Sequence, residues 1–174
     1  MDNISFSLNV ALILQGLGAL FDLIGYAAPY WHDERYVTYH FYYGLWKRCV
    51  EKGPFGTVIV EVCTSLISGD HAHGYTRATQ FFETVGLIAA IASIVLLLLG
   101  VCVATCRDRR ILPILSGICS IAAAGCILLG TVIFGANDAE EDHLSWAFAL
   151  CIVGGIFFGV AGVLIIVASV VLKR

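Results

Sequence analysis

Four long apolar runs limit what this chain can fold into. They extend over about 4–28, 81–105, 111–136 and 144–172, and each reaches the ~20 residues with which a helix crosses the hydrocarbon of a bilayer. The composition agrees, because 59% of the residues are hydrophobic and only 13% are charged, which lies outside the range of soluble globular domains. The sequence therefore predicts an all-α transmembrane four-helix bundle that forms one tetraspan membrane domain over residues 1–174.

The longest stretch outside these runs, residues 29–80, predicts a small antiparallel β-sheet. It contains a dense aromatic and β-branched run over 36–43 and a second such run over 57–63, and the turn Gly53-Pro54-Phe55-Gly56 lies between them. Such side chains suit a pleated surface, whereas Gly and Pro reverse the chain. The other external loop, 137–143, is short and acidic.

Orientation follows from charge and from cysteine placement. Four spans put both termini on one side of the membrane, and Arg107, Arg109, Arg110, Lys173 and Arg174 lie within a few positions of the helix ends there. Such a cluster is typical of the cytoplasmic face. Loop 29–80 holds as many basic residues, but most lie farther from the helix ends and are mixed with acids. Cys49 and Cys63 are its only cysteines, and a disulfide between them requires an oxidising compartment. We therefore expect a multi-pass plasma-membrane protein with both termini cytoplasmic and loop 29–80 outside.

The same sequence argues against several classes of protein. A formal net charge of −3 gives no basic surface for nucleic acid. No phosphate loop, dinucleotide fingerprint, hydrolase elbow or metalloprotease helix occurs. We therefore expect no enzyme, no cofactor and no nucleic-acid partner. His71 and His73 form a weak metal-binding pattern that is more typical of a solvated loop, so no metal site is predicted.

Two acids, Asp22 and Glu83, stand inside apolar runs. A carboxylate there is costly, roughly 2.5–3.5 kcal/mol near the bilayer centre on insertion scales. Asp22 lies about two turns before Pro29, and Glu83 less than two turns after Arg77, so both belong to the outer leaflet. One interpretation is an ion or proton path. The interpretation we favour is a pair of hydrogen-bonded or protonated acids that hold helix ends together near Arg77.

Small residues in the runs, such as Gly155-x-x-x-Gly159, predict close helix approach. We interpret them as packing within the chain's own bundle, and a dimer seam is the alternative. Cys102 and Cys106 flank the cytoplasmic end of the second run beside Arg107. That position favours S-palmitoylation, and the alternative is that both are small buried apolar residues.

The order Trp31, Gly44-Leu45-Trp46, Cys49, Cys63 and then Arg77 at the second helix resembles the signature of the claudin superfamily. This superfamily includes the claudins, the peripheral-myelin and epithelial membrane proteins, the lens intrinsic membrane protein and the channel-modulating gamma subunits. The resemblance covers essentially the whole chain. It implies that Cys49 and Cys63 form a disulfide and that Trp31 and Gly44-Leu45-Trp46 seat the sheet on the bundle, with Arg77 beside that seat. It also implies that the second loop adds one strand to the sheet.

The resemblance further implies a structural cell–cell contact protein that assembles with itself, laterally and across the gap between cells, and with related tetraspan proteins at cell junctions. We expect trans contact through Phe55 and a bias toward cations from the acids Glu51, Glu61 and Asp70. The alternative is an auxiliary subunit whose sheet docks on a channel or receptor of the same membrane. The two functions use one fold, and the sequence alone leaves both open.

Overall fold

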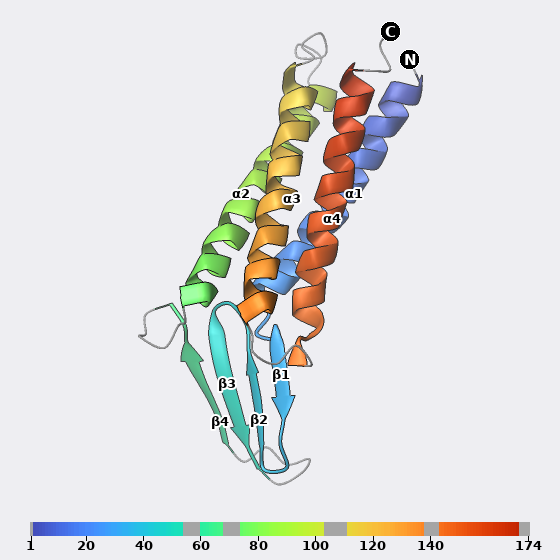
Figure 1. Cartoon of the computed structure of the whole chain (residues 1–174). Helices are drawn as coiled ribbons and strands as arrows, with labels where there is room; N and C mark the ends of the chain where they lie inside the picture. The colour runs from blue at the N-terminus through green and yellow to red at the C-terminus, as the bar shows by residue number, and fades with distance from the viewer. Residues whose placement is uncertain (1, 54–59, 68–73, 103–110, 138–142, 171–174) are drawn as a thin grey trace.

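The computed structural model describes residues 2–53, 60–67, 74–102, 111–137 and 143–170. Four helices run side by side, and a β-sheet projects beyond one end of the bundle (Figure 1). The helices are α1 (Asp2–Ala27), α2 (Gly74–Cys102), α3 (Ile111–Asn137) and α4 (Trp146–Val170). Each is long and apolar enough to cross a membrane. The predicted class, a transmembrane four-helix bundle with a small antiparallel sheet, is confirmed.

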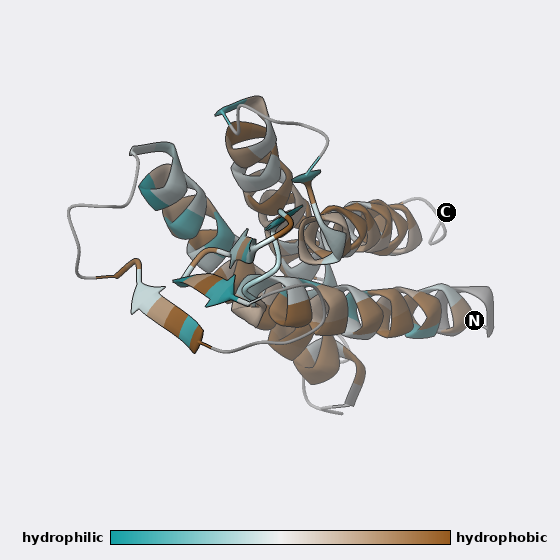
Figure 2. Cartoon of the chain, turned by 90° about the horizontal axis from the view of Figure 1, so that it is seen from below, coloured by the Kyte–Doolittle hydropathy of each residue, from teal (hydrophilic) through white to brown (hydrophobic). Residues whose placement is uncertain are grey.

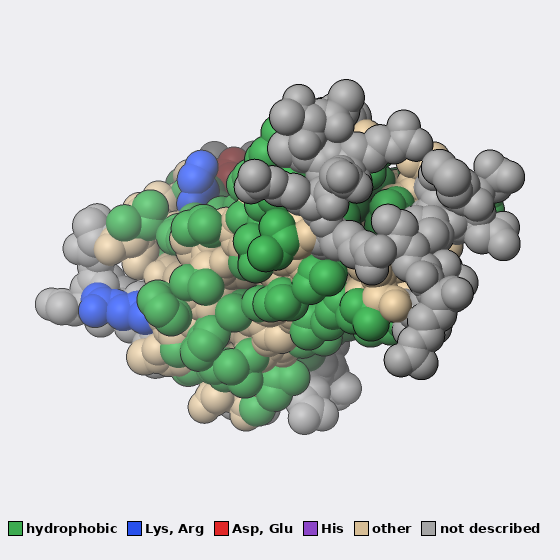
Figure 3. Space-filling view, turned by 90° about the horizontal axis from the view of Figure 1, so that it is seen from above, with side chains coloured by type: hydrophobic (Ala, Val, Ile, Leu, Met, Phe, Trp, Pro, Cys, Tyr) green, Lys and Arg blue, Asp and Glu red, His purple; other side chains and the backbone are tan. Residues whose placement is uncertain are grey.

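The outside of the bundle is apolar. Ile88 on α2 and Val132 on α3 are each 63% exposed, and hydrophobic side chains cover much of the described surface seen from the end opposite the sheet (Figure 3). Seen from the sheet end, the helices are mostly hydrophobic (Figure 2). The start of α1 and the end of α4 lie together at the end opposite the sheet (Figure 1). Such a surface suits lipid rather than water.

The helices pack through small residues. α1 packs mainly on α4, α2 on α3 and α3 on α4, whereas the contact between α1 and α2 is less extensive. A Cβ added to Gly18 would lie 3.1 Å from the Gly154 carbonyl oxygen, and one added to Gly117 would lie 2.7 Å from Ile166 Cγ1. These glycines therefore permit close helix approach within one chain.

Helix α2 begins at Gly74, seven positions before the expected start at 81. The apolar run marks only the part of a helix that lies in hydrocarbon, and this helix continues beyond it as a polar turn. Thr79 Oγ1 donates to the carbonyl oxygens of Tyr75 (3.0 Å) and Gly130 (3.3 Å). Loop 29–80 is accordingly shorter than expected.

The sheet has four antiparallel strands in the order β1-β2-β3-β4. They are β1 (His32–Arg35), β2 (Tyr39–Tyr43), β3 (Lys47–Lys52) and β4 (Val60–Ser65). The run expected as a strand over 36–43 enters the sheet only at Tyr39, because the chain reverses just before it. There the Tyr36 N–H donates to the Tyr39 carbonyl at 2.8 Å. The turn over residues 36–39 contains neither glycine nor proline. The turn residues 54–59 lie outside the described part.

The expected strand from the second loop is not found in the described residues. Leu144 forms one isolated bridge with His32, and the Ser145 N–H donates to the Trp31 carbonyl at 2.9 Å. Because α4 begins at Trp146, little chain remains to run along β1. Within the described ranges, the sheet is built by the first loop alone.

Gly44 lies where β2 turns toward β3, against the chain that leaves α1. A Cβ at this position would collide with the Ala28 carbonyl and lie 2.8 Å from Pro29 Cα. We predict that Gly44→Ala destabilises the protein by about 1–3 kcal/mol, a typical cost of overpacking, and lowers the Tm in detergent. Gly16→Ala is the matched control, because nothing lies within 4 Å of a Cβ there and alanine favours the helix. Equal Tm values for the two variants would contradict this account.

Candidate functional site

Two tryptophans fix the sheet to the end of α1. Trp31 Nε1 donates to the Gly25 carbonyl at 2.8 Å, and Trp46 Nε1 donates to the Tyr26 carbonyl at 2.9 Å. The last four carbonyls of a helix have no partner inside it. The indole N–H groups therefore cap α1, which ends at Ala27.

The same residues contact the other helices. Trp31 is fully buried, and its ring lies 4.9 Å from that of Phe134 on α3 and 5.7 Å from that of Phe148 on α4. Leu45 is also fully buried, and its carbonyl accepts from Gln80 Nε2 of α2 at 2.5 Å. Trp31, Leu45 and Trp46, which we call the seat of the sheet, therefore contact all four helices. Arg77 is exposed on the first turn of α2.

Cys49 and Cys63 form the predicted disulfide. They are directly opposite one another on β3 and β4, with Cα atoms 4.1 Å apart. A carboxylate oxygen of Glu61 lies within 4.8 Å of both sulfurs. A disulfide offers no thiolate, so this group is not a metal site.

Strand alternation divides the sheet into two faces. The register aligns Arg35, His40, Glu51 and Glu61 in one row across the four strands, and Asp33, Tyr42, Cys49 and Cys63 in the next. Both rows lie on one face, which we call the acidic face. Three of the four acids in the strands lie on it, and Glu34 lies on the other face.

A chain of polar contacts crosses the acidic face. His40 Nε2 lies 2.7 Å from Asp33 Oδ1, and His40 Nδ1 lies 3.2 Å from Glu51 Oε2. The Tyr42 hydroxyl donates to Glu61 Oε1 at 3.0 Å and lies 3.3 Å from Glu51 Oε1. Like charges directly opposite on a sheet repel, and this hydroxyl lies between the two carboxylates of Glu51 and Glu61.

The Tyr42 hydroxyl is a donor at neutral pH. Burial first, and then its hydrogen bond to Glu61, raise the pKa of Tyr42 well above its ordinary value. Its ring stacks on Tyr30, with centroids 4.8 Å apart. The Tyr42 hydroxyl therefore holds the carboxylates of Glu51 and Glu61 in place, and no lysine of the described strands lies between them.

The opposite face is aromatic. The Arg48 guanidinium lies 5.1 Å from the ring centroid of Phe41 and 5.5 Å from that of Tyr43, within the range of cation–π attraction. This base is therefore directed away from the acidic face.

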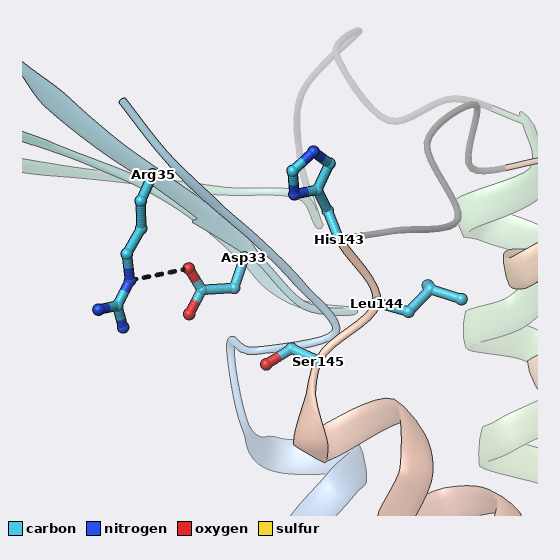
Figure 4. Close-up of a pocket in the computed structure, with 5 residues that line it drawn as sticks. All are labelled: Asp33, Arg35, His143, Leu144 and Ser145. Atoms are coloured by element: carbon cyan, nitrogen blue, oxygen red, sulfur yellow. Dashed lines mark ion pairs between the residues drawn. The ribbon is translucent and has the colours of Figure 1, made fainter. Parts of the chain in front are cut away.

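The two edges of the sheet differ. Every residue of β4 is exposed, and the side chains of Val60 and Val62 are 49% and 54% exposed. The β1 edge instead meets residues 143–145, where Asp33, Arg35, His143, Leu144 and Ser145 line an open hollow (Figure 4). In this hollow Arg35 Nε lies 3.5 Å from Asp33 Oδ1. Among the described strands, β4 thus presents the open edge.

A family model described as the PMP-22/EMP/MP20/Claudin family matches residues 6–165. The chain belongs to this family. Its members are structural membrane proteins, and the match includes most of each of the four helices and the whole described sheet. A comparison with curated proteins gives no match.

Several predicted sites of this family member lie outside the described residues, namely Phe55, Asp70 and Cys106. Cys102 is the last residue of α2, and its side chain also lies outside the described part. Sequence reasoning missed Asp33, His40 and Tyr42 as neighbours of the predicted acids Glu51 and Glu61. Counting alternate positions away from a paired Cys49 and Cys63 would have placed Glu51 and Glu61 on one face.

The disulfide yields a direct prediction. Alkylation of the folded family member without reduction should leave Cys49 and Cys63 unlabelled, as read by peptide mass spectrometry. Replacing both residues with alanine should lower the free energy of unfolding by about 3 kcal/mol, the chain-entropy value for a loop of about 15 residues. Cys126→Ala, a free cysteine on α3, provides the matched control. Labelling of either loop cysteine in the wild type would overturn the pairing.

Proposed function

We propose that this chain is a structural cell–cell contact protein of the plasma membrane, with the sheet outside the cell and both termini in the cytoplasm. Its sheets associate side by side and with sheets on the opposing cell to form a junction. Membership of the family and the four membrane-spanning helices support this proposal. Related tetraspan proteins are the natural partners in mixed assemblies.

The open β4 edge is the observation that carries the proposal. An exposed strand edge offers unpaired N–H and C=O groups to another chain, and β-strand addition is a recurrent mode of association. Soluble proteins often blunt such edges with lysine or proline, and β4, with the sequence Val-Glu-Val-Cys-Thr-Ser, contains neither. The disulfide holds β4 against β3. The edge is thus both exposed and fixed in position, and a second copy of the chain is its proposed occupant.

The acidic face supports a preference for cations in any path between the assembled sheets. Glu51 and Glu61 lie opposite one another, and Asp33 lies in the neighbouring row of the same face, beside His40. Of the nearby bases, Arg48 lies over the aromatic face, whereas Arg35 and Lys47 lie on the acidic face. Arg35 pairs with Asp33 at the margin, and the three acids of the face outnumber these two bases. The local field on this face is therefore negative.

We predict that the double substitution of Val60→Lys and Val62→Lys abolishes lateral association, because lysine on an edge strand prevents strand pairing. The measurement is cross-linking and freeze-fracture in cells that lack junctions, with surface biotinylation to verify delivery. Val37→Lys is the matched control, since Val37 is 73% exposed in the β1–β2 turn. Wild-type protein should concentrate at contacts between expressing cells.

Two outcomes would overturn the proposal. One is lateral association that persists in the β4 double variant. The other is a wild-type protein that never concentrates at cell contacts and instead co-purifies with a channel or receptor, which would assign it the role of an auxiliary subunit.

We predict that the combined change of Glu51→Gln and Glu61→Gln lowers the cation-over-anion permeability ratio of an expressing monolayer. A unit charge 4 Å from an ion contributes about 1 kcal/mol in water, which is about fivefold in permeability, so the loss of two charges should lower the ratio by at least about fivefold. Dilution potentials measure this ratio. Glu34→Gln is the control, because Glu34 lies on the opposite face of the same sheet, and it should leave the ratio unchanged. An equal fall in both variants would argue against the acidic face as the path.

A further inference from the structure

Three helices bring Asp22, Glu83 and Cys151 together below the sheet. Asp22 lies on α1, Glu83 on α2 and Cys151 on α4, and all three are 0% exposed. A carboxylate oxygen of each acid and the Cys151 sulfur all lie within 4.8 Å of one another. These residues have no spacing motif in the sequence and meet only in the folded chain.

All four carboxylate oxygens of this cluster are without a hydrogen-bond donor among the described residues. Elsewhere on α1, Gln15 Nε2 donates to Ser93 at 2.7 Å and to Ser120 at 3.2 Å, whereas its Oε1 is also buried without a partner. The Cys151 sulfur lies 3.9 Å from the main-chain carbonyl of Asp22. Two carboxylates buried side by side repel, and each is costly in hydrocarbon. A bound metal cation or a proton shared by the two acids would relieve this repulsion.

Glycines on neighbouring helices hold the three side chains in place. A Cβ on Gly25 would lie 2.5 Å from Cys151 Sγ, one on Gly130 would lie 2.9 Å from Glu83 Oε1, and one on Gly154 would lie 3.1 Å from Asp22 Cβ. Each ligand side chain thus occupies the space that a side chain on the facing helix would fill. This fixed placement is a property of a preformed site.

The cluster lies near the sheet end of the bundle. Asp22 precedes the end of α1 at Ala27 by five positions, and Cys151 follows the start of α4 at Trp146 by five. At 1.5 Å per residue, both lie about 8 Å inside the helix ends.

We propose that Asp22, Glu83 and Cys151 bind a divalent metal ion of the zinc class. Zinc accepts both carboxylate oxygen and thiolate sulfur, whereas magnesium and calcium take oxygen ligands, so the thiol decides between the classes. On binding, the Cys151 thiol releases its proton to water and its sulfur bonds the metal. Two carboxylates and one thiolate around a divalent ion leave one net negative charge in place of two. The ion would join α1 to α2, the neighbouring helices with the less extensive contact.

Cadmium tests the site, because its bond to a thiolate absorbs in the ultraviolet. The full chain, purified in detergent without a polyhistidine tag and treated with chelator, should bind about one Cd²⁺ per chain by elemental analysis and show this absorption. Cys151→Ala should lose the absorption. Asp22→Asn and Glu83→Gln should each weaken Cd²⁺ binding at least about tenfold, a change that even outer-shell substitutions often cause.

Two controls exclude other sites. Cys126→Ala removes a free, half-buried cysteine of α3, and His40→Ala removes the imidazole between two acids of the sheet. Both variants should keep the absorption and the stoichiometry. A second measurement needs no variant, since Cd²⁺ should raise the wild-type Tm by mass action, chelator should reverse the rise, and Mg²⁺ should not produce it.

The proposal fails if Cys151→Ala keeps the absorption or if neither acid variant loses affinity. It also fails if the wild type binds no Cd²⁺ and its Tm does not respond. If Asp22→Asn then raises the Tm, the occupant is a proton shared by the two acids. The site is independent of cell contact, so these outcomes do not bear on the proposed junction.

Discussion

The end of α1 imposes the constraint on which the rest of the structure depends. A helix that reaches the membrane surface must satisfy its last carbonyls, because an unpaired carbonyl is costly near hydrocarbon. In this chain Trp31 and Trp46 satisfy those of Gly25 and Tyr26. Both indoles belong to the loop between α1 and α2, one just before β1 and one in the β2–β3 turn. Capping of the helix and attachment of the sheet are therefore one interaction, and its sequence requirement is Trp31 together with Gly44-Leu45-Trp46.

The register of the sheet follows from a second fixed point. With Cys49 opposite Cys63, Glu51 must lie opposite Glu61, and a slip of one residue would send every side chain of β4 to the other face. The disulfide therefore does more than restrict the unfolded chain. It also determines which charged side chains lie on the same face of the sheet. The stability of the loop and the electrostatic field of this face therefore both depend on the disulfide.

The sequence predicted the features that depend on local patterns of residues. It did not predict the contacts between side chains that are far apart in the chain. Apolar length identified four spans, and the lone cysteines of the first loop identified the disulfide. Strand β1 was missed because His32–Arg35 is charged throughout and enters the sheet by pairing with β2 rather than by propensity. The contacts of His40 with Asp33 and Glu51 depend on register, which a strand pattern does not reveal. The sequence led us to expect Asp22 and Glu83 as a pair, and they do lie together. The place of Cys151 beside them depends on helix rotation, which apolar runs do not specify.

The sheet seat and the buried cluster share one residue, and this makes them mechanically dependent. The Gly25 carbonyl accepts the Trp31 indole, while the absent Gly25 side chain leaves the space that the Cys151 sulfur occupies. A shift of α1 that closes or opens the cluster must therefore move the acceptor of Trp31, on which the sheet rests. Because interiors are closely packed, such a shift is transmitted to the seat rather than absorbed. Occupancy of the cluster and the angle of the sheet on the bundle are consequently linked through the main chain of α1.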